Sequence, residues 1–163
     1  CHHRHCFTII ATMKTLTSSL LCLAALIGFT SAHAEIKEAA VEYKSSDVLC
    51  EGWQAYDDAV TGKRPGVLVV HQWTGISDHE KEAARKLAAL GYNVLVADIY
   101  GKGIRPQPPA AGKEAGKYKA DRPLLRARVN AALDVLSHDA RTDASKLAAT
   151  GYCFGGTAAI ELA

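Results

Sequence analysis

One short apolar segment of this chain runs directly into a glycine-rich turn: Leu147-Ala148-Ala149-Thr150-Gly151-Tyr152-Cys153-Phe154-Gly155-Gly156-Thr157. Gly-x-Cys-x-Gly has the spacing of a nucleophile elbow, a sharp strand-to-helix turn that presents a reactive side chain at the edge of a sheet. The residues two before and two after the nucleophile must lack bulk, because strand and helix pass close together there. Gly151 and Gly155 meet this requirement, so the pattern predicts that Cys153 is a nucleophile.

A buried structural cysteine beside the packing glycines of a helix would also fit these five residues. Two features of the neighbouring sequence favour the elbow. An apolar segment that can form a buried strand precedes the turn, and the small residues 157–160 that follow can begin a helix.

The pattern of apolar residues predicts a chain that alternates strands with helices. The expected strands are residues 36–43, 48–56, 67–70, 93–97 and 145–150, and the expected helices are residues 78–90 and 122–136 and one after the elbow. The buried faces of the first two helices are expected to be Ala83, Leu87 and Leu90, and Leu125, Val129, Ala132 and Leu136. A long loop is predicted over residues 101–120 from Pro106, Pro108, Pro109, Gly112 and Gly116.

This order of elements predicts a three-layer α/β fold, with a mostly parallel sheet covered on both faces and an antiparallel N-terminal hairpin. Side chains that follow parallel strands gather at the carboxyl edge of such a sheet. Residues 71–73, residues 98–100 and Cys153 all follow expected strands. We therefore expect them to lie near one another.

The composition narrows the function classes. The 163 residues allow one domain, with 48% hydrophobic and 22% charged residues. Arg4 and Lys14 account for the net charge of +2, so no basic patch suggests a nucleic-acid partner. Only two of the five cysteines, Cys50 and Cys153, follow residue 34, too few for a disulfide framework.

Residues 13–34 have the pattern of a secretory signal peptide: Met13 and Lys14, an apolar core too short to span a bilayer, and a small-x-small site at residues 32–34. We therefore expect a secreted or periplasmic protein that begins at Glu35. Residues 1–12 are interpreted as translated upstream sequence in preference to a metal site, and residues 35–163 as the N-terminal part of the domain.

The chain resembles the dienelactone hydrolase family of α/β-hydrolases, and in particular a secreted subgroup of it. The resemblance is carried by residues 65–75, residues 97–101 and the elbow at residues 151–156, where cysteine replaces the more usual serine. It implies an α/β-hydrolase fold and hydrolysis of small ester or lactone substrates, such as dienelactones (carboxymethylenebutenolides), without a cofactor or metal.

The resemblance also implies roles for individual residues. Cys153 would attack the substrate carbonyl and form an acyl-enzyme that water then cleaves. The backbone N–H groups of Phe154 and Trp73 would form the oxyanion hole. The side chains expected to line the pocket are Gln72, Tyr100 and Arg105.

Two departures from the family pattern matter. Gln72 stands where the family often has a glutamate that helps to deprotonate the thiol, and an amide cannot take a proton. In addition, the Asp and His of the triad follow the nucleophile in chain order, whereas this sequence ends at Ala163. We therefore expect a C-terminally truncated α/β-hydrolase domain that is inactive alone.

Other polar residues fit structural roles better than catalytic ones. His71 is expected to be a satisfied core histidine, His79 a solvated one, and Asp98 a residue that orients a loop. Arg105 could hold a substrate carboxylate or be a solvated loop residue. Two rival functions stay open: a non-catalytic family member that binds a small ligand, and a thiol redox protein that uses Cys153.

Overall fold

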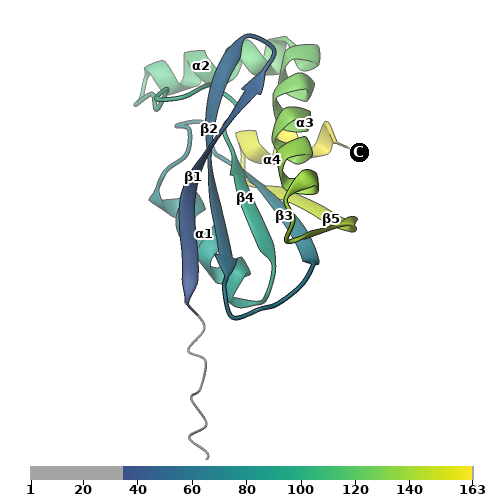
Figure 1. Cartoon of the computed structure of the whole chain (residues 1–163). Coiled ribbons are helices and arrows are strands. Elements are labelled where there is room, and N and C mark those ends of the chain that lie inside the picture. Colours follow the sequence, from purple (N-terminus) through teal and green to yellow (C-terminus); the bar gives the residue numbers. More distant parts are fainter. Residues whose placement is uncertain (1–34, 163) are drawn as a thin grey trace, which may run out of the picture. The chain divides into compact units, whose positions relative to one another are not determined.

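The computed structural model describes residues 35–162, in which five strands form one mixed sheet in the order β1-β2-β4-β3-β5 (Figure 1). The expected upstream segment and signal peptide lie outside the described residues. The elements are β1 (Ile36–Ser45), β2 (Val48–Asp57), β3 (Arg64–Val70), α1 (Asp78–Ala89), β4 (Asn93–Ala97), α2 (Ala110–Ala120), α3 (Arg122–His138), β5 (Thr142–Gly151) and α4 (Phe154–Ile160).

The sheet has the expected mixed character. β1 and β2 form an antiparallel hairpin, and β2 also pairs antiparallel with β4. β3 lies between β4 and β5 and pairs with both in parallel. The predicted parallel sheet with an antiparallel N-terminal hairpin is therefore confirmed. β5 forms one edge of the described sheet, and most of its residues are exposed.

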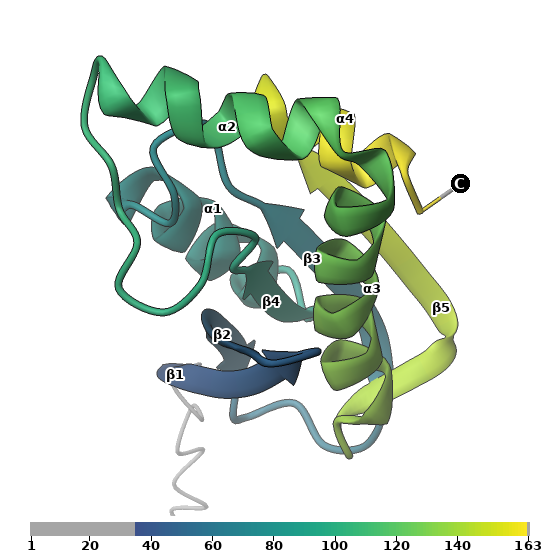
Figure 2. The ribbon, with the colours of Figure 1, turned by 90° about the horizontal axis from the view of Figure 1, so that it is seen from above.

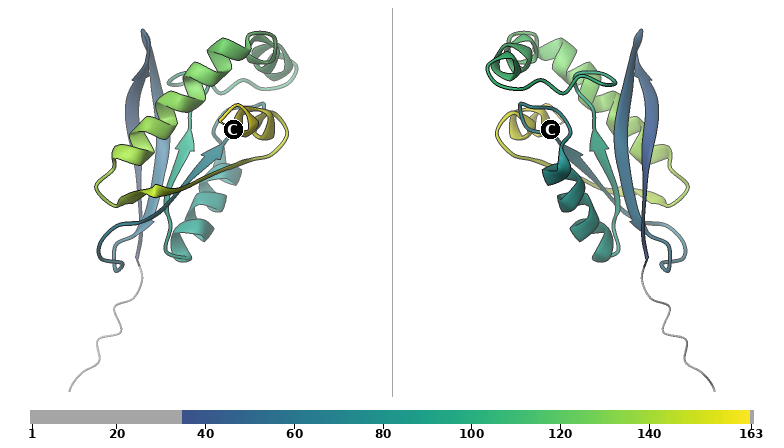
Figure 3. Two further views of the ribbon diagram at one scale, coloured as in Figure 1. Left: turned by 90° about the vertical axis from the view of Figure 1, so that its right-hand side faces the viewer. Right: turned by 90° about the vertical axis from the view of Figure 1, so that its left-hand side faces the viewer.

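Both faces of the central strands are buried because successive side chains point to opposite sides. Leu68 and Val70 belong to the core cluster that includes α3, whereas Val67 and Val69 belong to the cluster that includes α1. The two helices cover opposite faces of the sheet (Figure 3). This arrangement explains the continuous apolar run in β3. Within residues 35–162, no helix is long and apolar enough to cross a membrane.

Helix α1 begins where expected, but its buried face differs by about one position from the prediction. Ser77 is the N-cap and forms a reciprocal capping box with Glu80. The fully buried positions are Glu80, Ala84 and Ala88, while Leu90 follows the helix and is 74% exposed. The prediction that Leu90 is buried was wrong, because the helix ends at Ala89 and its capping residue turns outward.

The expected loop at residues 101–120 is wrong in its second half, where α2 lies across one end of α3 (Figure 2). All three prolines precede α2, and Pro109 is its N-cap. Within the helix, Ala111, Ala115 and Tyr118 are buried at helical spacing. The prediction treated the glycines of this segment as loop formers and so missed the helical spacing of its buried residues. A glycine lowers helix stability by only about 1 kcal/mol.

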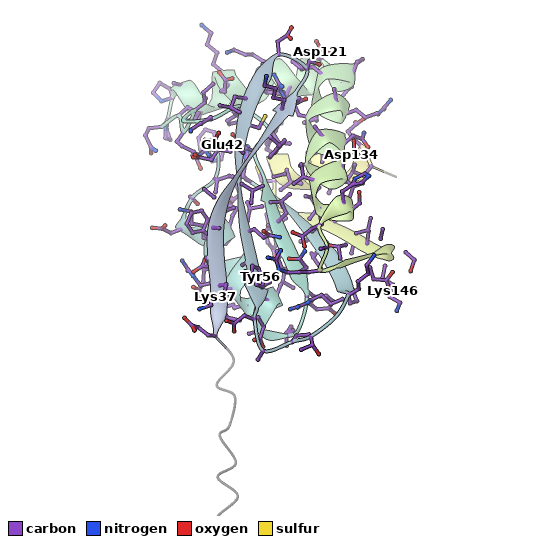
Figure 4. The ribbon with its side chains drawn as sticks, viewed as in Figure 1. Lys37, Glu42, Tyr56, Asp121, Asp134 and Lys146 are labelled. Atoms are coloured by element: carbon purple, nitrogen blue, oxygen red, sulfur yellow. The ribbon has the colours of Figure 1, made fainter. Side chains whose placement is uncertain are left out.

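Helix α3 and strand β5 extend slightly beyond the expected bounds. Asp121, labelled in Figure 4, caps α3 by accepting a hydrogen bond from the Leu124 N–H. The predicted inward face of α3 is confirmed, because all four of its expected residues are buried. Pro65 of β3 pairs with Asp143 of β5, whereas the next residue, Gly66, pairs with Leu147, so the register of β5 shifts at this point as in a β-bulge.

Candidate active site

Cys153 lies at the turn between β5 and α4 in an unusual backbone conformation. Its φ is 55° and its ψ is −116°, which a residue with a side chain adopts only under strain. The thiol-bearing residue is exposed, whereas Cys50, the other cysteine in residues 35–162, is buried. The turn therefore has the backbone expected of a nucleophile elbow.

The two flanking glycines are required by the close approach of strand and helix. A Cβ atom at Gly151 would lie 2.5 Å from the carbonyl carbon of Gly155. A Cβ atom at Gly155 would lie 2.2 Å from the carbonyl oxygen of Val70. The expectation that these positions must lack bulk is therefore confirmed.

Because of the sheet register, the two segments that carry the predicted oxyanion donors leave the sheet side by side. Val70, the last residue of β3, pairs with Gly151, the last residue of β5. Trp73 and Phe154 each come three residues after this pair. Within residues 35–162, neither backbone N–H donates to a protein acceptor. The Trp73 residue is 37% exposed, and Phe154 is buried.

The turn after β3 is fixed by side chains from other elements. The Gln72 N–H donates to Oε1 of Glu80 over 3.3 Å. The Trp73 carbonyl accepts a 2.9 Å hydrogen bond from the hydroxyl of Tyr100. Both partners are buried, so the backbone around Trp73 has little freedom to move.

His71 is a satisfied core histidine, as expected. Its Nε2 atom accepts a hydrogen bond from the Ile99 N–H over 3.2 Å, so Nδ1 carries the proton and donates to the Gln72 carbonyl over 2.5 Å. Complete burial lowers the pKa of His71 and keeps the ring neutral. With both nitrogens engaged, this imidazole is not available as a base for Cys153.

Asp98 orients the loop after β4, which confirms the structural interpretation. Its fully buried carboxylate accepts from the N–H groups of Glu51 and Gly101, and Arg105 lies 3.4 Å away. Arg105 also donates to the Ile104 carbonyl over 2.9 Å. The guanidinium is therefore occupied largely by the protein's own oxygens.

Arg105 lines a cavity of about 230 Å³ between β2 and the beginning of α1. The cavity is lined by Glu51, Gly52, Trp53, Ile76, Lys81 and Arg105. Cys153 does not border it. Direct contact between Arg105 and a substrate stays a prediction.

The remaining predicted residues lie as follows. Gln72 is half-buried in the turn after β3. The Tyr100 ring is buried between His71, at a centroid distance of 4.6 Å, and Phe154, at 5.5 Å. His79 is exposed, as expected, and its ring lies 6.0 Å from that of Tyr152 beside the elbow.

Sequence reasoning missed Glu80. Its carboxylate is almost fully buried and accepts hydrogen bonds from the Ser77 N–H at 2.9 Å and hydroxyl at 2.6 Å, as well as from Gln72. Burial opposes its charge, but these hydrogen bonds outweigh burial and hold the pKa of Glu80 below its ordinary value. The Ser-x-x-Glu spacing at residues 77–80 is a capping-box signal that could have revealed it.

The strand order, the covering helices and the strained elbow define an α/β-hydrolase. The sequence model of the dienelactone hydrolase family matches residues 51–163, well over half of the chain. The chain therefore belongs to the dienelactone hydrolase family.

Individual relatives agree with this assignment. The crystal structure of a dienelactone hydrolase-like promiscuous phosphotriesterase from metagenomic libraries is 38% identical, with a TM-score of 0.76 over 78% of this chain and 54% of that one. A Bradyrhizobium protein named "probable 2-oxo-3-(5-oxofuran-2-ylidene)propanoate lactonase" is 35% identical over 62% of this chain and 41% of its own length. A dienelactone hydrolase from Anabaena variabilis, 23% identical with a TM-score of 0.56 over 77% of this chain and 56% of its own, supports the fold. This chain thus spans about half the length of such relatives.

Proposed function

We propose that the full-length protein, including any sequence after residue 163, hydrolyses small carboxylic esters or lactones through an acyl-enzyme on Cys153. The observation that carries this proposal is the strained elbow, which holds Cys153 exposed at the beginning of α4. Backbone strain at one exposed cysteine is costly and is typical of functional sites. The lactonase name of the Bradyrhizobium relative supports the substrate class.

The proposed reaction has two steps. The Cys153 thiolate attacks the carbonyl carbon and forms a C–S bond, and the negative charge moves to the carbonyl oxygen. The N–H groups of Trp73 and Phe154 stabilise that oxyanion; one such donor contributes about 10²–10³ in rate. The C–O bond then breaks, the alcohol leaves with a proton, and water cleaves the thioester.

The histidine that moves these protons is proposed to come from sequence after residue 163, together with its orienting aspartate. Neither His71 nor His79 fits that role, because the first has both ring nitrogens engaged and the second lies exposed on α1. The 163 residues alone are therefore proposed to lack turnover. The unpaired edge at β5 leaves room for further strands.

The residue at position 72 determines how the thiol of Cys153 is expected to be deprotonated. A neutral amide neither accepts a proton nor repels a thiolate, so the downstream histidine would act alone. Gln72→Glu is then expected to change the pH dependence of Cys153 alkylation by iodoacetamide, whereas Gln72→Ala changes it little. If the alanine variant shifts the alkylation midpoint as far as the glutamate variant does, position 72 acts through hydrogen bonding or packing.

The test of the function is hydrolysis of p-nitrophenyl acetate and of a dienelactone by the full-length protein. We expect turnover well above that of a free thiol, and its loss in Cys153→Ala. The matched control is Cys50→Ala, which removes a buried thiol and should retain turnover. Stoichiometric ligand binding without turnover would instead favour the non-catalytic ligand-binding function. Reversible oxidation of Cys153 without hydrolysis would favour the thiol redox function.

A further inference from the structure

The peptide group between Gln72 and Trp73 carries both a fixed carbonyl and the proposed oxyanion N–H. The Gln72 carbonyl accepts from Nδ1 of His71 at 2.5 Å and from the Gly75 N–H at 3.3 Å. In a trans peptide the N–H of the next residue points away from this carbonyl. Fixing the carbonyl of Gln72 therefore fixes the direction of the Trp73 N–H.

The His71 ring cannot turn without losing several contacts. Its other nitrogen accepts from the Ile99 N–H in the loop after β4, and the ring is fully buried. Tyr100 meets it edge-on, and Phe154 stacks on it with centroids 5.8 Å apart. Phe154 supplies the second proposed oxyanion N–H, so one imidazole contacts both halves of the expected oxyanion hole.

We propose that His71 is a positioning residue for ester or lactone hydrolysis: it holds the Gln72–Trp73 peptide plane so that the Trp73 N–H faces the oxyanion beside that of Phe154. The inference rests on the proposed function of Cys153. A ring that only filled space in the core could be apolar. This ring instead donates to the turn after β3 and accepts from the loop after β4.

Two amide substitutions separate the hydrogen bonds of His71. Asparagine places an amide nitrogen near the position of Nδ1 and can still donate to the Gln72 carbonyl. Glutamine reaches the position of Nε2 and can accept from Ile99, but it leaves that carbonyl without its donor. His138→Gln, at an exposed histidine in α3, is the matched control.

The experiment measures kcat, KM, the rate of Cys153 alkylation and the NMR shift of the Trp73 amide in the full-length protein. His71→Gln should lower kcat about 100-fold with little change in KM, because a donor displaced by about 1 Å loses that much. His71→Asn should recover most of the loss. Alkylation by iodoacetamide should stay at the wild-type rate in both, since it forms no oxyanion. The Trp73 amide shift should move in His71→Gln and not in His71→Asn or His138→Gln.

Each contrary result has a distinct meaning. An unmoved Trp73 amide in His71→Gln overturns the positioning role, whatever the protein catalyses. Equal loss of kcat in both variants, or a parallel loss of alkylation, means that His71 only supports the core. A moved amide with unchanged kcat would show that the Trp73 N–H is not the oxyanion donor. That result would overturn the positioning role of His71 in hydrolysis, while hydrolysis through Cys153 would stand.

Discussion

At the scale of single residues, the strained conformation of Cys153 is possible only because the flanking positions 151 and 155 are glycines. Gly155→Ala would place a Cβ atom 2.2 Å from the Val70 carbonyl oxygen, which belongs to the backbone and cannot move aside cheaply. We expect a loss of about 1–3 kcal/mol in the free energy of unfolding, together with loss of the elbow geometry.

The control for this substitution is Gly116→Ala in α2, where a Cβ atom has no neighbour within 4 Å. Alanine should stabilise that helix by about 0.5–1 kcal/mol. Urea unfolding of both variants measures the difference. Equal stability of the two alanine variants would mean that the approach at Gly155 relaxes and that bulk is tolerated next to Cys153.

Glu80 makes the turn after β3 sensitive to acid. Its pKa in the folded protein lies below the ordinary 4.5, so the unfolded chain binds more protons between these two values. Its stabilisation is fully present above about pH 4.5 and is lost as the pH falls through the folded pKa. Glu80→Gln should lower the free energy of unfolding at pH 7 by about 1–3 kcal/mol and show a shallower fall below pH 4.5.

The measurement is denaturant unfolding of the wild type and of Glu80→Gln at several pH values between about 3 and 7, a range that spans the ordinary carboxyl pKa. Glu82→Gln is the control, because Glu82 is exposed on the same helix and only pairs with Arg85 and Lys86. Parallel pH profiles for all three proteins would contradict a role of the buried charge.

Some of the site could be predicted from residue spacing and some could not. The elbow was predictable because Gly-x-Cys-x-Gly reports a local steric requirement, which the contacts at Gly151 and Gly155 confirm. The hydrogen bonds from Tyr100 to Trp73 and from Ile99 to His71 join residues 27 and 28 positions apart. No local pattern contains such pairings, because they depend on the order of the strands.

At the scale of elements, α2 is the clearest test of the structure, because the sequence favoured a loop there. Ala115 is buried on its inner face and Ala120 is exposed at its end. Ala115→Glu should destabilise the protein by about 3 kcal/mol or more, since it buries an unpaired charge. Ala120→Glu should be nearly neutral. Thermal unfolding measures both variants. Equal unfolding temperatures would contradict the assignment of residues 110–120 to a helix with Ala115 on its buried face.

The strands and α3 were easier to predict than α1 and α2. Continuous apolar runs identify β3 and β4, since both faces of these strands are covered. In α1 the burial of Glu80 depends on a loop that precedes the helix, so hydrophobicity alone placed the inner face incorrectly. In α2 the buried residues are mostly alanines, which give only a weak periodic signal.

At the scale of the whole molecule, the N-terminal residues lie outside the described structure, and export stays a prediction. The prediction rests on Lys14, the apolar segment after it and the small residues at positions 32 and 34. Mass spectrometry of exported protein should find Glu35 at the N-terminus. Mature protein that retains Met13 would contradict the predicted cleavage.

The central claim is that Cys153 carries the acyl group, and intact-protein mass spectrometry tests it most directly. The full-length protein is mixed with p-nitrophenyl acetate, quenched in acid within one turnover, and digested to locate the modification. We predict one acetyl group per chain, attached to the peptide that contains Cys153, and none in Cys153→Ala. Two results would contradict the account: an acetyl group on a residue other than Cys153, or hydrolysis by Cys153→Ala at the wild-type rate.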